Sequence, residues 1–174
     1  MLQLKPLVHL ILEGYSLPWH GTHGVGHWAR VLENGSRLAK ETRANVEVVQ
    51  LFAIFHDSRR VNEGIDEGHG KRGGDLALEL RNDWIALSDD EFELLYQACA
   101  GHTDGETEAD ITIQTCWDAD RMDLGRVGIL PTPQKLCTPA AKNMTMLRWA
   151  DGRAAFEVVP ELVKTDWEID LNGG

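Results

Sequence analysis

The sequence predicts an all-α fold, a helical bundle formed by a single domain. Apolar residues recur at helical spacing in successive segments of the chain. No two runs of alternating apolar and polar residues are joined by a hairpin turn, so a β-sheet is not expected. The length of 174 residues suggests one domain, since domains average about 150 residues. We therefore expect one domain over residues 1–174 with six to eight helices.

The first half of the chain contains three predicted helices. The N-terminal segment predicts a helix and not a signal peptide, because His9 and Glu13 interrupt its apolar stretch and no cleavage-site pattern is present. Residues 25–44 carry apolar side chains on a helical period. Residues 46–56 form an apolar run that is long for a strand and does not alternate, so we expect a buried helix with Asn45 as its N-cap.

Three further helices are expected in the middle of the chain. Residues 70–84 place apolar side chains at helical spacing. Ser88 followed by Glu91 is a capping-box pattern that starts a helix over residues 89–100, which Gly101 should stop. Residues 111–124 have the pattern of another helix.

The C-terminal part begins with an irregular stretch marked by Pro131, Pro133 and Pro139. Residues 140–156 predict a final long helix, weakened at Gly152 and followed by Pro160. We expect the terminal Asn-Gly-Gly to be frayed.

Composition and charge restrict the classes of partner. Hydrophobic residues make up 43% and charged residues 26%, which is typical of a globular protein and excludes collagen, a coiled-coil rod and wholesale disorder. A net charge of −11 repels nucleic-acid polymers and anionic membranes, so neither is an expected partner. Three cysteines without a CxxC motif indicate reduced thiols and a cytoplasmic location. No apolar run approaches the roughly 20 residues of a membrane span.

Two short motifs place polar residues beside apolar helices. His56 and Asp57 end the apolar run, and burying an aspartate is unfavourable unless it is paired or binds a metal. The alternative is a helix end that reaches solvent. His23 and His27 have the i, i+4 spacing of many metal sites, although two surface histidines would show the same spacing.

A third motif and the remaining histidines complete the candidates. Asp118, Asp120 and Asp123 form an acidic cluster, which could equally be a solvated helix face with Arg121 as neighbour. We treat His9 and His20 as structural. The other histidines lie at segment ends that suit the rim of a cleft: His23, His27, His56, His69 and His102.

In chain order, the set His27, His56-Asp57 and Asp120 resembles the HD-domain superfamily of metal-dependent phosphohydrolases. The stretch from His23 to Val31 is similar to the family's first helix motif, and Leu51 to Asp57 to its His-Asp doublet. Asp118-Ala-Asp120-Arg121 is similar to its late Asp-Arg motif. The motif core spans about residues 21–128, and residues 139–165 would form a C-terminal helical extension.

The resemblance implies an all-α bundle and a divalent metal ion bound by His27, His56, Asp57 and Asp120. Asp57 and Asp120 would also be catalytic. The implied reaction is attack at phosphorus by a metal-activated water, on a small soluble phosphate ester such as a nucleotide. Nitrogen and oxygen donors without thiolates suit Mn²⁺, Fe²⁺, Co²⁺, Ni²⁺, Zn²⁺ or Mg²⁺, and the sequence does not choose among these ions.

Further residues resemble auxiliary groups of the superfamily. His69, His102 and His23 would hold a second metal ion or contact phosphate. Four cations near the motifs would bind phosphate, unless they are surface charges or helix caps: Arg59, Arg60, Lys71 and Arg72. Guanosine-tetraphosphate hydrolases and 5′-deoxynucleotidases of the superfamily carry a glutamate where this chain has Arg60, so neither activity is assigned.

Three rival functions stay open at this point. The chain could be a non-catalytic module that binds a nucleotide or a metal, a di-iron oxygenase of the HD type, or a structural helical domain. A homodimer is also open, because the apolar N-terminal helix could pack on its own core or on a second copy.

Overall fold

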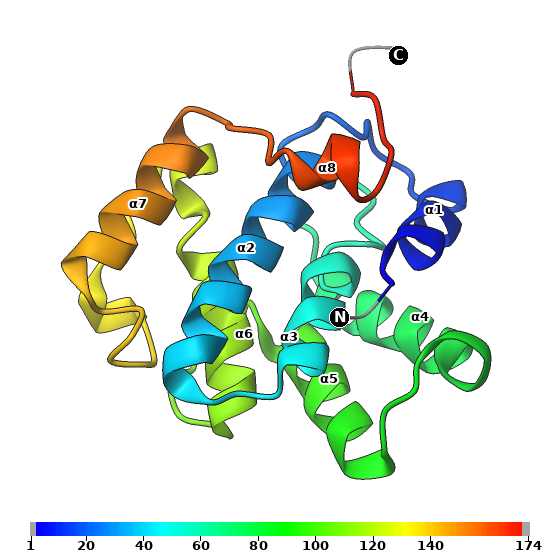
Figure 1. Cartoon of the computed structure of the whole chain (residues 1–174), viewed down its shortest axis with the longest axis horizontal. Coiled ribbons are helices and arrows are strands. Elements are labelled where there is room, and N and C mark those ends of the chain that lie inside the picture. Colours follow the sequence, from blue (N-terminus) through cyan, green and yellow to red (C-terminus); the bar gives the residue numbers. More distant parts are fainter. Residues whose placement is uncertain (1–2, 172–174) are drawn as a thin grey trace.

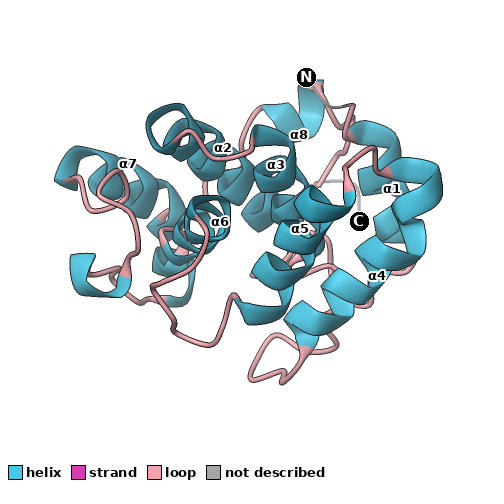
Figure 2. Cartoon of the chain, turned by 90° about the horizontal axis from the view of Figure 1, so that it is seen from below, coloured by secondary structure: helices cyan, strands magenta, loops and turns pink. Residues whose placement is uncertain are grey.

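Helices account for all the regular secondary structure of residues 3–171, which this computed structural model describes (Figures 1 and 2). No strand occurs in that range, so the predicted all-α fold is confirmed. In chain order the helices are α1 (Lys5–Glu13), α2 (Val25–Thr42), α3 (Val46–Phe55), α4 (His69–Trp84), α5 (Asp89–Gly101), α6 (Ile111–Arg121), the 3₁₀ helices η1 (Leu124–Val127) and η2 (Pro133–Lys135), α7 (Met144–Ala155) and α8 (Leu162–Thr165).

Helix α3 lies at the centre of the bundle, in contact with α2, α4, α5 and α6 (Figure 1). Eight of its ten residues are apolar, and its residues 51–55 are almost fully buried. Asn45 caps it as expected, because its side chain accepts hydrogen bonds from the amides of Glu47 and Val48. The apolar run is therefore the core helix of the fold.

Helix α2 packs against α3 and α6 and covers most of the predicted range. It ends at Thr42, where Arg43 adopts a left-handed conformation with φ 61°. Since α2 begins at Val25, His23 lies in the preceding turn. His23 and His27 therefore do not share a helix face, although the i, i+4 interpretation required it.

Helices α4 and α5 lie close to their predicted positions. The Ser88–Glu91 capping box at the start of α5 is confirmed. The expected stop at Gly101 is wrong by one position, because the helix includes Gly101 and His102 caps it. A side chain at Gly101 would approach the Trp117 ring to 3.2 Å, so this glycine permits the contact between α5 and α6.

The C-terminal helices differ most from the prediction. Helix α6 ends at Arg121, before the 3₁₀ helix η1. Helix α7 begins at Met144 and not at residue 140, because the Asn143 side chain caps it by accepting from two following amides. It ends at Ala155, well before Pro160, and α8 follows it. The terminal Asn-Gly-Gly lies outside the described residues.

Helix α1 packs on the protein's own core through Leu7, Val8, Ile11 and Leu12. His9 joins it to the C-terminal segment, since Nε2 lies 2.7 Å from the Trp167 carbonyl oxygen. The apolar face of α1 is therefore used within the chain. Among the helices described, none has the length and apolar character needed to cross a membrane.

Two glycines bring α4 close to its neighbours. A Cβ atom at Gly73 would lie 2.1 Å from the carbonyl oxygen of Phe55, at the end of α3. At Gly70 it would lie 2.2 Å from the carbonyl oxygen of Cys99, near the end of α5. Any larger residue would force these helices apart. The glycines thus set the start of α4 beside the ends of α3 and α5.

Candidate metal centre

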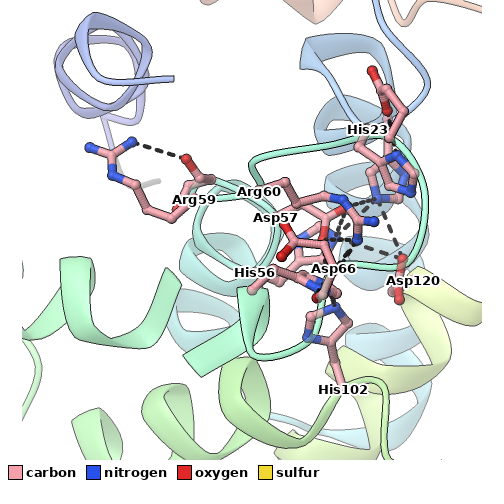
Figure 3. A network of polar contacts seen from close by, with 12 residues as sticks. His23, His56, Asp57, Arg59, Arg60, Asp66, His102 and Asp120 are labelled. Atoms are coloured by element: carbon pink, nitrogen blue, oxygen red, sulfur yellow. Dashed lines mark hydrogen bonds and ion pairs between the residues drawn. The ribbon is translucent and has the colours of Figure 1, made fainter. Parts of the chain in front are cut away.

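The ends of five helices bring a cluster of buried histidines and aspartates together (Figure 3). The first turn of α2 and the first residue of α4 each supply a histidine, and the ends of α3, α5 and α6 supply the rest. All these residues are less than 9% exposed. The members are His27, His56, Asp57, His69, His102 and Asp120.

The first group consists of the four residues expected to bind one metal ion. Nε2 of His27 lies 3.0 Å from Nε2 of His56. It also lies 3.5 Å from Oδ2 of Asp57 and 3.4 Å from Oδ1 of Asp120. His56 Nε2 lies 3.8 and 3.7 Å from the same two carboxylate atoms. The structure thus brings together side chains that are up to 93 positions apart, from His27 to Asp120.

The second group lies on the other oxygen of Asp57. Oδ1 of Asp57 is 3.1 Å from Nε2 of His69 and 3.6 Å from Nε2 of His102. The two imidazole nitrogens are 2.9 Å apart. The Asp57 carboxylate therefore lies between the two groups and faces each with one oxygen.

The orientation of the four histidine rings is fixed by their Nδ1 atoms. A carbonyl oxygen only accepts hydrogen bonds, so an Nδ1 atom that contacts one carries the proton. Nε2 of a neutral ring is then a free lone pair, as in most metal-binding histidines. The acceptors are Asp123 Oδ2 for His27 at 2.7 Å, Phe52 O for His56 at 3.1 Å, Asp66 O for His69 at 2.6 Å and Cys99 O for His102 at 2.7 Å.

Such lone pairs repel one another at about 3 Å unless a cation or a proton lies between them. Buried carboxylate oxygens add to this need, because Oδ1 of Asp57 and Oδ1 of Asp120 have no hydrogen-bond partner among the described residues. In each group, donor atoms of two histidines and Asp57 lie within 4.8 Å of one another. Imidazole nitrogens and carboxylate oxygens suit a divalent ion, so the residues fit a metal.

The protonation states agree with this fit. Burial lowers the pKa of His56 to about 3, so the ring is neutral at physiological pH. Burial alone would raise the pKa of Asp120, but His56 and Arg126 outweigh it and the pKa falls to about 2. The pKa of Asp57 is lowered well below its usual range against the same effect of burial, by the surrounding imidazoles. Ionised carboxylates and a neutral His56 are the forms that bind a metal in the first group. In the second group, the pKa of His102 is raised against the effect of burial, because its ring lies beside the Asp57 carboxylate.

Comparisons with known proteins identify the fold. A scan against family models and a search of curated proteins each found no match. The structure is similar to a crystal structure of a predicted HD superfamily hydrolase from an uncultured Thermotogales bacterium. The TM-score is 0.67 at 23% sequence identity, over 94% of this chain and 91% of that chain. The chain has the HD-domain fold. The expected fold is thereby confirmed.

Within this HD-domain fold, His23 lies beside the cluster but outside both groups. Its Nδ1 lies 2.6 Å from Oε2 of Glu63, and its backbone carbonyl accepts from Tyr15 and Trp28. The rings of His23 and His27 are 6.2 Å apart between centroids. His23 is thus in the surroundings of the first group.

The four predicted phosphate-binding cations divide into one that reaches the cluster and three that do not. Nη1 of Arg60 lies 3.0 Å from Nε2 of His69. Arg59 points toward α1 and donates to the carbonyl of Ile11 (Figure 3). Lys71 is exposed and pairs with Asp75, and Arg72 pairs with Asp66. The geometry therefore gives no support to phosphate contacts by Arg59, Lys71 or Arg72, because none of the three contacts a residue of the cluster.

The sequence motifs did not assign a role in the site to two charged residues, Asp123 and Arg126. Asp123 was noted only as part of the acidic cluster, yet it holds His27 and accepts two hydrogen bonds from Arg30. Arg126 is buried, with Nη2 3.7 Å from Oδ1 of Asp120. Asp120, Asp123 and Arg126 are spaced three residues apart, which is about one helical turn. This spacing could have indicated that Asp123 and Arg126 lie on the same side of the chain as Asp120.

Asp118 has a structural role in this HD-domain fold, although it belongs to the same acidic cluster. Its carboxylate accepts hydrogen bonds from the amides of Cys137 and Thr138 and from the Thr138 hydroxyl, at 2.7 to 2.8 Å. It is fully buried and faces the loop before α7. Of the three aspartates in the acidic cluster, Asp118 therefore serves folding, whereas Asp120 and Asp123 lie against the histidines.

A cavity of about 320 Å³ lies beside the cluster. His102 and Asp120 form part of its wall, next to Arg121 and Lys135. The remaining wall is mainly apolar and is formed by Leu124, Pro131 and Leu136 with the short residues Thr103 and Gly105. A volume of this size is typical of small-molecule sites.

Proposed function

We propose that this protein is a metal-dependent phosphohydrolase that acts on a small phosphate ester. The observation that carries the proposal is the convergence of the His27 and His56 lone pairs on the Asp57 and Asp120 carboxylates. Four such donors, two neutral and two negative, match one divalent ion and leave coordination positions open. The resident ion would be Mn²⁺, Fe²⁺, Co²⁺, Ni²⁺, Zn²⁺ or Mg²⁺.

The chain's own residues would hold the ion and the substrate. A divalent ion bound by His27, His56, Asp57 and Asp120 would supply an acidified water and draw charge from a phosphoryl oxygen. Asp123 would keep His27 in the required tautomer. The rigid helix ends keep these donors in place before the substrate arrives.

Two buried guanidinium groups favour a phosphate group as the anion. Arg126 lies against Asp120, and its Nε has no hydrogen-bond partner among the described residues. Arg60 lies on the other side, near Asp57. Guanidinium groups bind phosphoryl oxygens through paired hydrogen bonds, so both could orient a phosphate over the centre.

The cavity beside Asp120 would receive the alcohol part of the ester. Its apolar wall favours a leaving group with a flat or apolar body, and Lys135 offers a cation at its edge. The size suits a group such as a nucleoside. A nucleoside monophosphate is therefore the first substrate class to test.

The test is turnover by protein that has been stripped and reloaded with each candidate ion. The screen covers phosphomonoesters, phosphodiesters and nucleotides, and it measures released phosphate or alcohol. Asp57→Ala should lose both bound metal and activity, whereas Asp83→Ala on the exposed face of α4 should keep both. Nucleotide binding without hydrolysis under all ions would favour a binding module. Oxygen consumption with two irons per chain would favour the oxygenase.

A further inference from the structure

Arg60 places a positive charge in the second group of the cluster. Its Nη1 lies 3.0 Å from Nε2 of His69 and 3.6 Å from Oδ1 of Asp57. The side chain is only 7% exposed. In the first group Arg126 lies 3.7 Å from Oδ1 of Asp120, but no guanidinium of the described residues contacts Nε2 of His27 or His56.

We propose that the Arg60 guanidinium serves as the cation of the second group, so that the protein holds one divalent ion and not two. The single ion would lie in the first group, between His27, His56, Asp57 and Asp120. This inference rests on the proposed function, since it assumes that the first group binds a metal.

The guanidinium is held in place by the loop that follows α3. Nη2 of Arg60 donates to the carbonyl of Gly64 at 2.6 Å, and Nε donates to the carbonyl of Asn62 at 3.3 Å. These contacts leave Nη1 to face His69. An arginine stays protonated in proteins, so this charge is permanent at any working pH.

The lone pair of His69 can serve one cation only. Nδ1 of His69 contacts the Asp66 carbonyl and therefore carries the proton. Nε2 has a single lone pair, which lies within hydrogen-bond distance of Arg60. A metal ion would have to take this lone pair from the guanidinium, and it would also have to displace Nη1 from beside Asp57.

Charge balance opposes a second ion as well. Three buried carboxylates, Asp57, Asp120 and Asp123, lie against three guanidinium groups, Arg30, Arg60 and Arg126. One divalent ion leaves a net charge that a phosphate dianion can neutralise. A second divalent ion would double the excess in a buried site, where unpaired charge is strongly unfavourable. Arg60 therefore selects a one-ion centre and stays available to contact the substrate.

The experiment counts manganese ions in four proteins. Wild type, Arg60→Gln, Arg60→Lys and the double variant Arg60→Gln with His69→Ala are loaded with Mn²⁺, dialysed and analysed by elemental analysis and electron paramagnetic resonance. Wild type and Arg60→Lys should hold one isolated ion per chain. Arg60→Gln should hold two, with the spectrum of an exchange-coupled pair, and the double variant should return to one.

Each other result decides against a defined part of the proposal. Two ions in wild type, or one ion in a folded Arg60→Gln, would overturn the role of Arg60 and leave the phosphohydrolase proposal intact. No ion in wild type would overturn the phosphohydrolase proposal itself, and the present inference with it. If Arg60→Gln fails to fold, the counts for wild type and Arg60→Lys still decide, because two ions in either would contradict the inference.

Discussion

Nδ1 of His27 lies 2.7 Å from Oδ2 of Asp123, and both side chains are fully buried. Asp123 also accepts hydrogen bonds from Arg30 at 2.7 and 3.0 Å, which fixes the carboxylate. The proton on Nδ1 leaves Nε2 free to face His56 and Asp120. One aspartate outside the two groups thus determines how the first group presents its donors.

We expect Asp123→Asn to weaken Mn²⁺ binding by about 10- to 100-fold, the usual effect of losing a partner that orients a metal-binding histidine. An amide can donate to Nδ1 and so favour the tautomer that protonates Nε2. Isothermal titration measures the affinity. Because the change also leaves Arg30 unpaired, the double variant with Arg30→Gln is the control. Unchanged Mn²⁺ affinity in Asp123→Asn would contradict this role.

Asp118 and Asp120 should respond to substitution in opposite ways. Asp118→Ala removes three hydrogen bonds to the loop before α7, two of them buried, and each hydrogen bond to a charged group contributes about 1.5–3 kcal/mol. We expect the free energy of unfolding to fall by at least about 3 kcal/mol, with metal content per folded chain unchanged. Urea unfolding and elemental analysis measure the two quantities.

Asp120→Ala should show the reverse pattern. It removes a buried carboxylate whose Oδ1 has no hydrogen-bond partner among the described residues, and Arg126 keeps Asp123 as an ionic partner, so the metal-free protein should lose less stability than with Asp118→Ala. The bound ion should be lost. Equal effects of the two substitutions on metal content would show that the division between folding and binding aspartates is wrong.

The convergence in the first group was expected from the resemblance to the HD-domain superfamily, and the apolar pattern located the helices whose ends carry its residues. His56 and Asp57 follow the core helix directly, and Asp120 lies near the end of α6. The cations after the doublet could not be assigned in the same way. Arg59 and Arg60 are adjacent, yet one donates to the Ile11 carbonyl and the other contacts His69. That difference depends on the path of the loop, which local pattern does not determine.

The start of α7 is a second feature that the sequence pattern did not predict correctly. Ala140 and Ala141 favour a helix by propensity, but Asn143 caps the helix from a later position. Residues 138–143 form instead a turn in which the Thr138 hydroxyl accepts from the amide of Ala141. Asp118 anchors that turn from a distant helix. Tertiary contacts of this kind override propensity and are invisible along the chain.

Alanine substitutions at two glycines should distinguish a position where two helices approach closely from a position with open space around it. In Gly73→Ala the new methyl group would meet the Phe55 carbonyl, so α4 must move away from the end of α3. Overpacking of this kind destabilises by about 1–3 kcal/mol, and the shift should also reduce Mn²⁺ affinity, because His56 and His69 lie at this junction. Thermal unfolding and isothermal titration measure both effects.

Gly152→Ala is the matched control, since nothing lies within 4 Å of a Cβ atom at this position in α7. Alanine in a helix interior is about 0.5–1 kcal/mol more favourable than glycine, so the variant should be more stable than wild type. Its metal affinity should not change. Destabilisation by Gly152→Ala, or none by Gly73→Ala, would contradict the packing described.

Glu91 should make stability depend on pH in the acidic range. Its carboxylate accepts hydrogen bonds from the Ser88 amide at 2.9 Å, from the Ser88 hydroxyl and from the Asn45 side chain, and these lower its pKa. Glu91 thus joins the caps of α5 and α3. A carboxyl group whose pKa is lowered on folding stabilises the protein above its unfolded pKa, which is about 4.3 for glutamate.

The contribution of Glu91 should therefore be complete above about pH 5 and disappear as the pH falls through the pKa of the folded state. Glu91→Gln keeps an acceptor for the Ser88 amide but cannot titrate. We expect the difference in free energy of unfolding between wild type and Glu91→Gln to be constant above about pH 5 and to shrink below about pH 4. Urea unfolding at a series of pH values measures it. A difference that stays constant down to pH 3 would mean that the Glu91 carboxylate contributes nothing through its charge, and that the cap depends only on the hydrogen bond that glutamine retains.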